Sequence, residues 1–404
     1  MRGRRYGEPG RGIRPVLAPA VAATTAGVVG WWAITAGTLI DTVVFRSAAH
    51  AVLAGQSPYV LRTVVPFVYP PAGVLAILPT ALGSSVGAAA TVWVGLSLAA
   101  LARTTWVLVA MAWPSLDRRQ ALRRTCWLFA VACVLEPTLI TLSFGQVGLL
   151  LLWLTVEGLG TQPGGVRRTW LVGVAAAVKI TPAIVLVGLA AAGRWRTAAW
   201  GVVGLVGASV AAAVAAPAAV RDYVGGSWGL AQDVNATPDL LNHSVIGVVA
   251  VVGLPAGVGL GLAAAVLVLG IALTARPWRD GDELAGLATV LVTGLLVSPV
   301  SWGHHWVAVY PGLVLLLREV RARRAGVVVL LSTAVLGMLL QVDGLGLQGS
   351  RVLPPGEVWQ VAQRDWPVAW GIAFLAWAGV ALLVRRAEVG STPSDRTAQT
   401  MLSS

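Results

Sequence analysis

The stretch LAPAVAATTAGVVGWWAITAGTLID, residues 17–41, decides the fold class of this 404-residue chain. Its apolar run extends from Leu17 to Leu39 and is longer than the ~18 residues that indicate a membrane-spanning helix. The run is also too long for the apolar core of a signal peptide. It therefore predicts a first transmembrane helix, and the acidic residue Asp41 lies where that helix meets water.

The composition extends this prediction to the whole chain. Hydrophobic residues make up 57% of it and charged residues 11%, with a mean hydropathy of +0.78, whereas soluble domains carry roughly 25% charged residues. Most of the surface must therefore face lipid. We expect an all-α polytopic integral membrane protein with about 10–12 transmembrane helices. Residues 1–390 are expected to form one domain, and the polar residues 391–404 a disordered cytoplasmic tail.

The arginines lie in short blocks between the apolar runs. Such blocks mark the cytoplasmic side of a membrane, so the net charge of +12 does not indicate a nucleic-acid partner. The expected spans lie near residues 17–39, 86–112, 125–142, 146–162, 197–217, 247–274, 284–301, 305–317, 325–342 and 366–384. The segments expected on the outer side are 41–70, 143–146, 218–246, 302–305 and 343–365.

The apolar run at residues 169–193 does not fit this alternation, because arginines lie at both of its ends. It contains Lys179, the only lysine of the chain, three residues before Pro182. Proline removes a backbone donor and disfavours helix in the residue before it. We therefore expect two short helices that meet near Lys179 and that enter and leave on the cytoplasmic side.

Lys179 itself has two interpretations. A lysine at the bilayer centre costs at least ~2.5–3.5 kcal/mol and usually marks a substrate path, which favours a cavity that holds an anionic partner. The alternative is that the side chain reaches water from near a helix end.

Asp41 also has two interpretations. A carboxylate at the end of a span can cap the next helix, or it can be a catalytic group, and its position alone does not separate the two. The residues that follow, to about Leu53, have a helical period typical of a helix in the membrane interface.

Two adjacent histidines, His304 and His305, end the motif S-P-V-S-W-G-H-H at residues 298–305. No cysteine or acidic motif accompanies them, which argues against a zinc site, and we expect neither a metal nor a cofactor. Imidazole donates hydrogen bonds and titrates near neutrality. Contacts with a phosphate or a sugar are therefore the favoured interpretation.

Six ordered motifs follow Asp41. They are G-x-S-P-Y at 55–59, F-x-Y-P-P at 67–71, F-G-Q at 144–146, K-x-T-P at 179–182 with R-W-R at 194–196, N-x-S at 242–244, and S-P-x-S-W-x-H-H at 298–305. Together they resemble the actinobacterial polyprenyl-phosphate-sugar-dependent glycosyltransferases of the GT-C superfamily, glycosyltransferase family 87, which includes α-1,2-mannosyltransferases that extend phosphatidylinositol mannosides and lipomannan.

The resemblance implies a GT-C-like helix bundle in the plasma membrane and sugar transfer on its outer face. The donor would be a polyprenyl-phosphate sugar, mannose before arabinofuranose, and the acceptor a lipid-linked glycan. Asp41 matches the acidic residue proposed as general base, and Lys179, His304 and His305 match the K-x-T-P and H-H positions. The residues expected to contact the donor phosphate or sugar are Arg46, Tyr59, Tyr69, Gln146, Lys179, Asn242, Ser298, Trp302, His304 and His305.

The chemistry of such a transfer agrees with these residue types. A phosphate departs as an anion, so the reaction needs a carboxylate to accept the proton of the attacking hydroxyl and fixed cations near the phosphate. His304, His305 and an outward arginine, Arg46 or Arg62, could supply the positive charge. A single carboxylate, instead of the closely spaced pair of retaining hydrolases, indicates single displacement with inversion.

A secondary transporter is the main alternative from another class, because transporters also use broken helices and midplane charges. A flippase for lipid-linked sugars is a second. The chain shows no internal repeat, and its acidic and histidine residues gather at outer junctions, so a glycosyltransferase is the favoured function.

Overall fold

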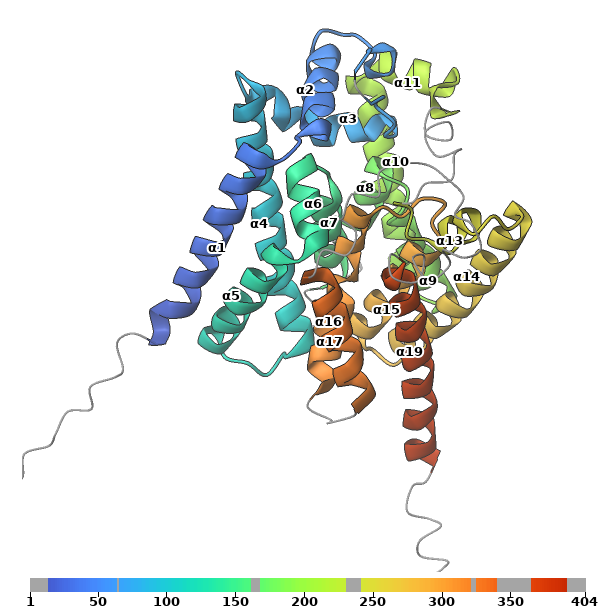
Figure 1. Cartoon of the computed structure of the whole chain (residues 1–404). Helices are drawn as coiled ribbons and strands as arrows, with labels where there is room; N and C mark the ends of the chain where they lie inside the picture. The colour runs from blue at the N-terminus through green and yellow to red at the C-terminus, as the bar shows by residue number, and fades with distance from the viewer. Residues whose placement is uncertain are drawn as a thin grey trace, which may run out of the picture.

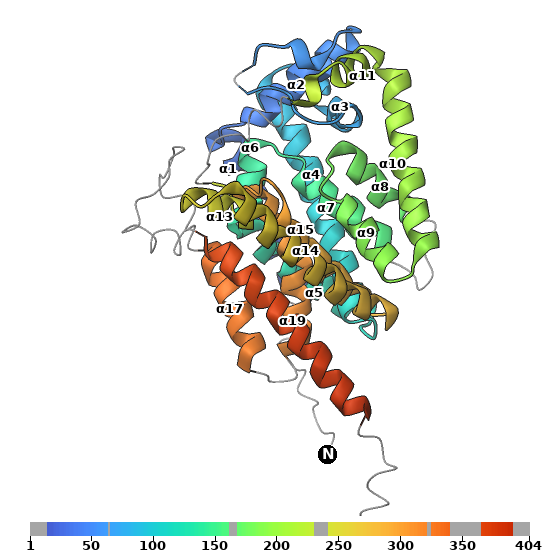
Figure 2. The same cartoon turned by 90° about the vertical axis from the view of Figure 1, so that its right-hand side faces the viewer.

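The computed structural model describes residues 14–63, 65–160, 168–229, 241–320, 325–339 and 365–390. Within these residues the fold is all-helical and has no strand, which confirms the all-α prediction. The expected tail at 391–404 and nearly all of the expected outward segment 343–365 lie outside them. The helices form an elongated bundle (Figures 1 and 2).

The described residues of the first half of the chain form ten α-helices. They are α1 (Arg14–Ala36), α2 (Ile40–Leu53), α3 (Pro71–Ile77), α4 (Val86–Ala112), α5 (Arg118–Val134), α6 (Glu136–Phe144), α7 (Gly148–Leu159), α8 (Trp170–Val178), α9 (Ala183–Ala191) and α10 (Trp195–Ala215). The described residues of the second half form α11 (Pro217–Val224), α13 (Val245–Val251), α14 (Ala256–Arg279), α15 (Glu283–Val297), α16 (Tyr310–Glu319), α17 (Ala325–Leu339) and α19 (Trp366–Gly390). Short 3-10 turns are η1 (Pro58–Val60), η2 (Leu78–Leu82), η4 (Ser227–Gly229) and η5 (Gly303–Val309).

Among the described residues, five helices are long and apolar enough to cross a membrane, namely α1, α4, α10, α14 and α19. The pair α5 and α6, bent by 68°, would be a sixth. This confirms a multi-span membrane protein. Other expected spans appear as shorter apolar helices, such as α7, α15 and α17. Proline and glycine explain part of the difference: Pro137 lies at the α5–α6 bend, and Gly253, at φ +75°, separates α13 from α14.

The run at 169–193 is broken as expected. α8 ends at Val178, Lys179 has an extended backbone (φ −149°, ψ 130°), and α9 begins at Ala183. α8 packs closely on α10, because a Cβ at Gly173 would collide with the Gly201 carbonyl, and one at Gly204 with the Trp170 carbonyl. The two short helices thus form a hairpin with Lys179 at its tip.

Ion pairs join the turns at the other end of this hairpin. Arg194, which follows α9, contacts Glu283 at 2.7 Å, and Arg318 at the end of α16 contacts Asp282 at 2.7 Å. Asp282 also caps α15 by accepting from the Ala285 N–H. Three turns expected on the cytoplasmic side therefore lie together at one end of the molecule.

At the opposite end, α2, α3 and α11 lie together (Figures 1 and 2). Phe45 of α2 meets Tyr69 and Trp93 edge-to-face, with ring centroids 5.4 and 5.7 Å apart. Such aromatic pairs stabilise beyond the area they bury. The hydrophobic cluster around these three rings fixes α2, and with it Asp41, over the ends of α4 and α7.

Candidate active site

Asp41 is positioned by a strained turn between α1 and α2. Leu39 is the only non-glycine residue with positive φ (50°) among the described residues, and a left-handed conformation costs a residue with a Cβ roughly 1–2 kcal/mol. Its N–H donates to the Ser143 carbonyl at 2.8 Å. The N-cap of α2 is Leu39, without a side-chain hydrogen bond. Asp41 is therefore not the cap, and its carboxylate is available for another role.

A chain of hydrogen bonds orients the Asp41 carboxylate. Gln146 Nε2 donates to Asp41 Oδ2 at 2.7 Å, and the Tyr69 hydroxyl donates to Gln146 Oε1 at 2.8 Å. The Tyr59 hydroxyl donates to the Tyr69 carbonyl at 2.7 Å. Because Tyr69 occupies the amide oxygen, the amide nitrogen must face Asp41. Three residues expected at the donor thus hold the carboxylate in place.

Gly145 allows the Gln146 turn to approach α2. It has φ +78°, and a Cβ there would collide with the Thr42 side chain. The indole N–H of Trp93 donates to its carbonyl at 2.7 Å. Glycine is therefore required at this position of F-G-Q, because it combines a left-handed backbone with close packing.

Lys179 and His305 form the second part of the site. Lys179 Nζ lies 2.6 Å from His305 Nε2 and 5.5 Å from the centre of the Tyr69 ring. The backbone N–H of Trp302 lies 3.1 Å from His305 Nδ1, on the other side of the ring. An ammonium group only donates. Lys179 and His305 are hydrogen-bonded to each other, and the N–H groups of Lys179 that do not face His305 can donate to an anion beside the pair.

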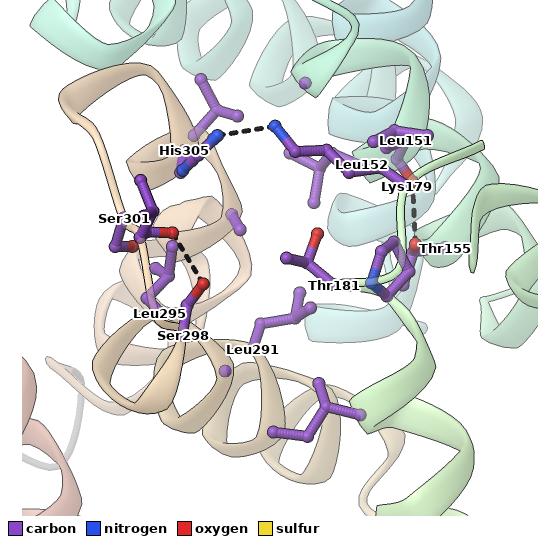
Figure 3. Close-up of a pocket in the computed structure, with 17 residues that line it drawn as sticks. Leu151, Leu152, Thr155, Lys179, Thr181, Leu291, Leu295, Ser298, Ser301 and His305 are labelled. Atoms are coloured by element: carbon purple, nitrogen blue, oxygen red, sulfur yellow. Dashed lines mark hydrogen bonds between the residues drawn. The ribbon is translucent and has the colours of Figure 1, made fainter. Parts of the chain in front are cut away.

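A pocket with about 630 Å³ of empty space opens beside this pair. α7, the tip of the α8–α9 hairpin, α15 and the segment 298–308 line it. Figure 3 shows Lys179 and His305 extending toward one another from opposite walls of it. Its polar lining residues are Thr155, Lys179, Thr181, Ser298, Ser301 and His305.

Asn242 and Ser298 hold the turn that presents His305. Asn242 Nδ2 donates to the Pro299 carbonyl at 2.8 Å, and its Oδ1 accepts from the Ser301 N–H at 2.9 Å. The Ser298 hydroxyl donates to the Val300 carbonyl at 2.6 Å. Both residues were expected to contact the donor, and in the structure their hydrogen bonds fix the backbone between α15 and η5.

The aromatic rings around His305 complete this turn. Trp302 stacks on the His305 ring, with centroids 6.0 Å apart and an interplanar angle of 18°. His304 is buried and meets the His305 ring at 4.3 Å. The two histidines thus differ, since His305 lines the pocket and His304 packs behind it.

Comparison with known proteins identifies the family of the chain. The profile of Glycosyltransferase family 87 matches residues 67–299, more than half of the chain. The chain belongs to glycosyltransferase family 87. This confirms the resemblance drawn from the six motifs.

Curated relatives of this family 87 glycosyltransferase come from mycobacteria. A "polyprenol-phosphate-mannose-dependent alpha-(1-2)-phosphatidylinositol pentamannoside mannosyltransferase" of Mycobacterium tuberculosis is 30% identical over 79% of this chain and 71% of the relative. A "polyprenol-phosphate-mannose-dependent alpha-(1-2)-phosphatidylinositol mannoside mannosyltransferase" of Mycolicibacterium smegmatis is 29% identical over 98% of this chain and 94% of the relative. No solved structure matches the chain.

The protonation of Asp41 in the family 87 enzyme follows from its surroundings. Asp41 lies outside the candidate spans. Burial raises the pKa of its carboxyl from 3.8 to about 6, while the Gln146 hydrogen bond and the positive charge of Lys179 lower the pKa. The group is therefore mostly ionised near neutral pH and can accept a proton.

Arg46 and Arg62, the arginines expected on the outer side, have other partners or positions in the family 87 enzyme. The Arg46 guanidinium donates to the carbonyls of Gly83 and Ser84, each at 3.3 Å, while Arg62 is exposed. Lys179 is therefore the cation whose charge acts on Asp41. Within the described residues, no group of three or more His, Cys, Asp and Glu side chains could hold a metal ion.

Sequence reasoning missed two functional candidates. Asp365 contacts His243 Nδ1 at 3.2 Å, and this buried pair supports the Asn242 segment. Ser301 is fully buried and lines the pocket. A signal for Ser301 was present, because it lies inside the S-P-x-S-W-x-H-H motif, whereas Asp365 is isolated in sequence from all the other site residues.

Proposed function

We propose that this glycosyltransferase moves mannose from a polyprenyl-phosphate donor to a hydroxyl of a phosphatidylinositol-mannoside-type acceptor, forming an α-1,2 linkage. The observation that carries the proposal is the pairing of two groups. An oriented carboxylate, Asp41 bonded to Gln146, lies beside a hydrogen-bonded pair, Lys179 and His305. The names of the mycobacterial relatives support the choice of mannose and of the acceptor.

The reaction is a single displacement. Asp41 accepts the proton of the attacking hydroxyl as its oxygen bonds to the anomeric carbon. The bond between that carbon and the phosphate oxygen breaks, and the electron pair leaves with the polyprenyl phosphate. Lys179 and His305 donate hydrogen bonds to the departing anion and stabilise the charge that develops on it. With one carboxylate at the centre, a β-linked donor gives an α-linked product.

The depth of the site supports catalysis at the outer half of the plasma membrane. Lys179 is separated from Arg194 by the 9-residue helix α9, which is ~14 Å long at 1.5 Å per residue. That is about half of the ~30 Å hydrocarbon core. With Arg194 on the cytoplasmic side, Lys179 lies near the midplane, and Asp41 lies beyond it toward the outer side.

The test is a transfer assay with the full-length protein in vesicles. Radiolabelled polyprenyl-phosphate mannose and a phosphatidylinositol mannoside are supplied, and labelled glycolipid is the expected product. Decaprenyl-phosphate arabinose serves as the competing donor, and transfer of arabinose alone would overturn the choice of sugar. Uptake of label into vesicles without a covalent product would show a carrier in place of an enzyme.

A further inference from the structure

We propose that a groove on the lipid-facing side of α5 binds the headgroup of an anionic phospholipid from the cytoplasmic leaflet. The groove holds about 780 Å³ of empty space and is partly open to its surroundings; it is lined by Leu116, Gln120, Arg123, Arg124, Trp127 and Leu128. It shares no lining residue with the pocket beside Lys179. The groove is therefore a separate lipid site, and its ligand takes no part in the sugar transfer.

The groove follows one face of α5 and lies away from the bundle. Its lining residues recur every three or four positions, which places them on one side of a helix. Thr125, Phe129 and Cys133 are buried and occupy the other side, where α5 packs on α1 and α4. Trp127, in the groove, is 42% exposed. The lining residues therefore face outward, toward the lipid.

The groove changes from polar to apolar along the helix axis. α5 begins at Arg118, at the lower end of the bundle in Figure 1, where the other turns expected on the cytoplasmic side also lie. Trp127 follows Arg123 by four residues. Leu128 follows Arg124 at the same spacing, so each apolar residue lies ~6 Å further along the helix than its arginine. A phospholipid in that leaflet has the same order, with its phosphate outermost and its acyl chains deeper.

Two guanidinium groups carry the positive charge of the groove. Arg123 is exposed, and the Arg124 guanidinium lies 4.1 Å from the centre of the Trp113 ring. Stacking of this kind holds a guanidinium in a defined plane, and a guanidinium matches a phosphate through paired N–H donors. None of the described residues that line the groove is acidic. The nearest acidic residue in sequence, Asp117, caps α5 by accepting from the Gln120 N–H at 2.8 Å.

Arginines of other helices and turns lie beside carboxylates. Arg103 forms two hydrogen bonds of 2.8 Å to Glu157, and the ion pairs of Arg194 and Arg318 are 2.7 Å long. The groove differs, because its described lining includes two arginines and no carboxylate. Clustered arginines next to the cytoplasmic leaflet attract anionic lipids. The charge of the groove is thus complementary to an anionic headgroup.

A phospholipid fits this groove better than a free phosphate ion. Free phosphate would contact only the arginine end of the groove, whereas Trp127 and Leu128 are stabilised only when hydrocarbon covers them. An exposed indole is also typical of the membrane interface, where its ring lies at the level of the headgroups. Both ends of the groove are therefore used only by a ligand that joins a phosphate to acyl chains.

Native mass spectrometry of the purified full-length protein in detergent tests the inference by counting bound lipids during a titration with phosphatidylglycerol. The wild-type protein should retain one phosphatidylglycerol more tightly than phosphatidylcholine. The double substitution Arg123→Gln/Arg124→Gln should raise the dissociation constant of that lipid about tenfold or more, because charged hydrogen bonds to the phosphate are lost. The matched control is Arg118→Gln/Arg119→Gln, which removes the same charge from exposed residues of α5 outside the groove. Its dissociation constant should stay within about threefold of the wild-type value.

Two further measurements keep the test decisive, and neither requires mannose transfer. Arg123→Gln alone replaces the double substitution if the latter does not show the wild-type melting transition without lipid, because Arg123 is exposed; its dissociation constant should rise about three- to tenfold. Inorganic phosphate at millimolar concentration should leave the bound phosphatidylglycerol in place. Equal weakening in both double substitutions, equal affinity for phosphatidylglycerol and phosphatidylcholine, or displacement by inorganic phosphate would overturn the inference.

Discussion

The two parts of the candidate site differ in how their polar groups are held. At Asp41, a chain of hydrogen bonds through Gln146, Tyr69 and Tyr59 fixes the carboxylate. At Lys179, the ammonium bonds to the neutral partner His305, and the nearby Ser301 hydroxyl has no partner among the described residues. The first part is therefore assembled before any substrate binds, while the second is completed by an anion. This division suits a reaction in which the base is permanent and the phosphate comes and goes.

Among these substitutions, Asp41→Asn is expected to have the largest effect. The amide keeps the shape of the side chain but cannot accept the proton, so we expect kcat to fall about 10²- to 10⁴-fold. Donor affinity should change little, because the phosphate is held by the other part of the site. Steady-state transfer with purified protein, together with polyprenyl phosphate binding, measures both. Near wild-type kcat would show that Asp41 is not the base.

Lys179→Met tests the part of the site that we expect to bind the donor phosphate. Loss of the ammonium should weaken donor binding about ten- to a hundredfold, as expected for a charged hydrogen bond in a low-dielectric site. Arg62→Met is the control, since it removes an exposed outward cation. The apparent KM for the donor is the readout, and an unchanged KM would assign Lys179 a structural role only.

The pH dependence of kcat tests the protonation state of Asp41. Because burial holds the pKa of Asp41 at about 6, the base form dominates above that pH and is lost below it. We expect kcat to be level between pH 7 and 8 and to fall about tenfold per pH unit well below 6. An acid limb that lies near pH 4 would mean that the carboxyl is exposed to water when the enzyme acts.

Gln146→Leu should have the smallest effect. The hydrogen bond from Gln146 lowers the pKa of Asp41, so its removal should move the acid limb of kcat to higher pH. The loss of orientation should also reduce kcat about three- to tenfold at pH 8. Donor KM serves as the control, because Gln146 does not line the pocket. A large rise in donor KM with an unmoved acid limb would make Gln146 a donor-binding residue.

The sequence predicted the class of the fold, because apolar runs and arginine blocks are local signals, and its rare residues indicated the candidate site positions. The single lysine and Pro182 predicted the break between α8 and α9, which the structure confirms. The bends at α5–α6 and α13–α14 were not foreseen, because short breaks within a long apolar run do not change its hydropathy.

The partners of each site residue could not be predicted from spacing. Asp41 and Gln146 are 105 residues apart in sequence, and Lys179 and His305 are 126 apart. Only the folded packing shows that Gln146 bonds to the carboxylate and that Asn242 bonds to the backbone beside Ser301. Residue type indicated which positions belong to the candidate site. The tertiary structure was needed to show which partners these residues contact.

The anomeric configuration of the product reports whether Asp41 acts as the base of a single displacement. Purified protein would be given β-linked polyprenyl-phosphate mannose and a phosphatidylinositol mannoside, and the new linkage would be read by NMR from the coupling at its anomeric carbon. We expect an α-linked mannose, because one carboxylate activates the acceptor and the phosphate leaves from the opposite face. A β-linked product, or no product from a protein that binds both substrates, would contradict it.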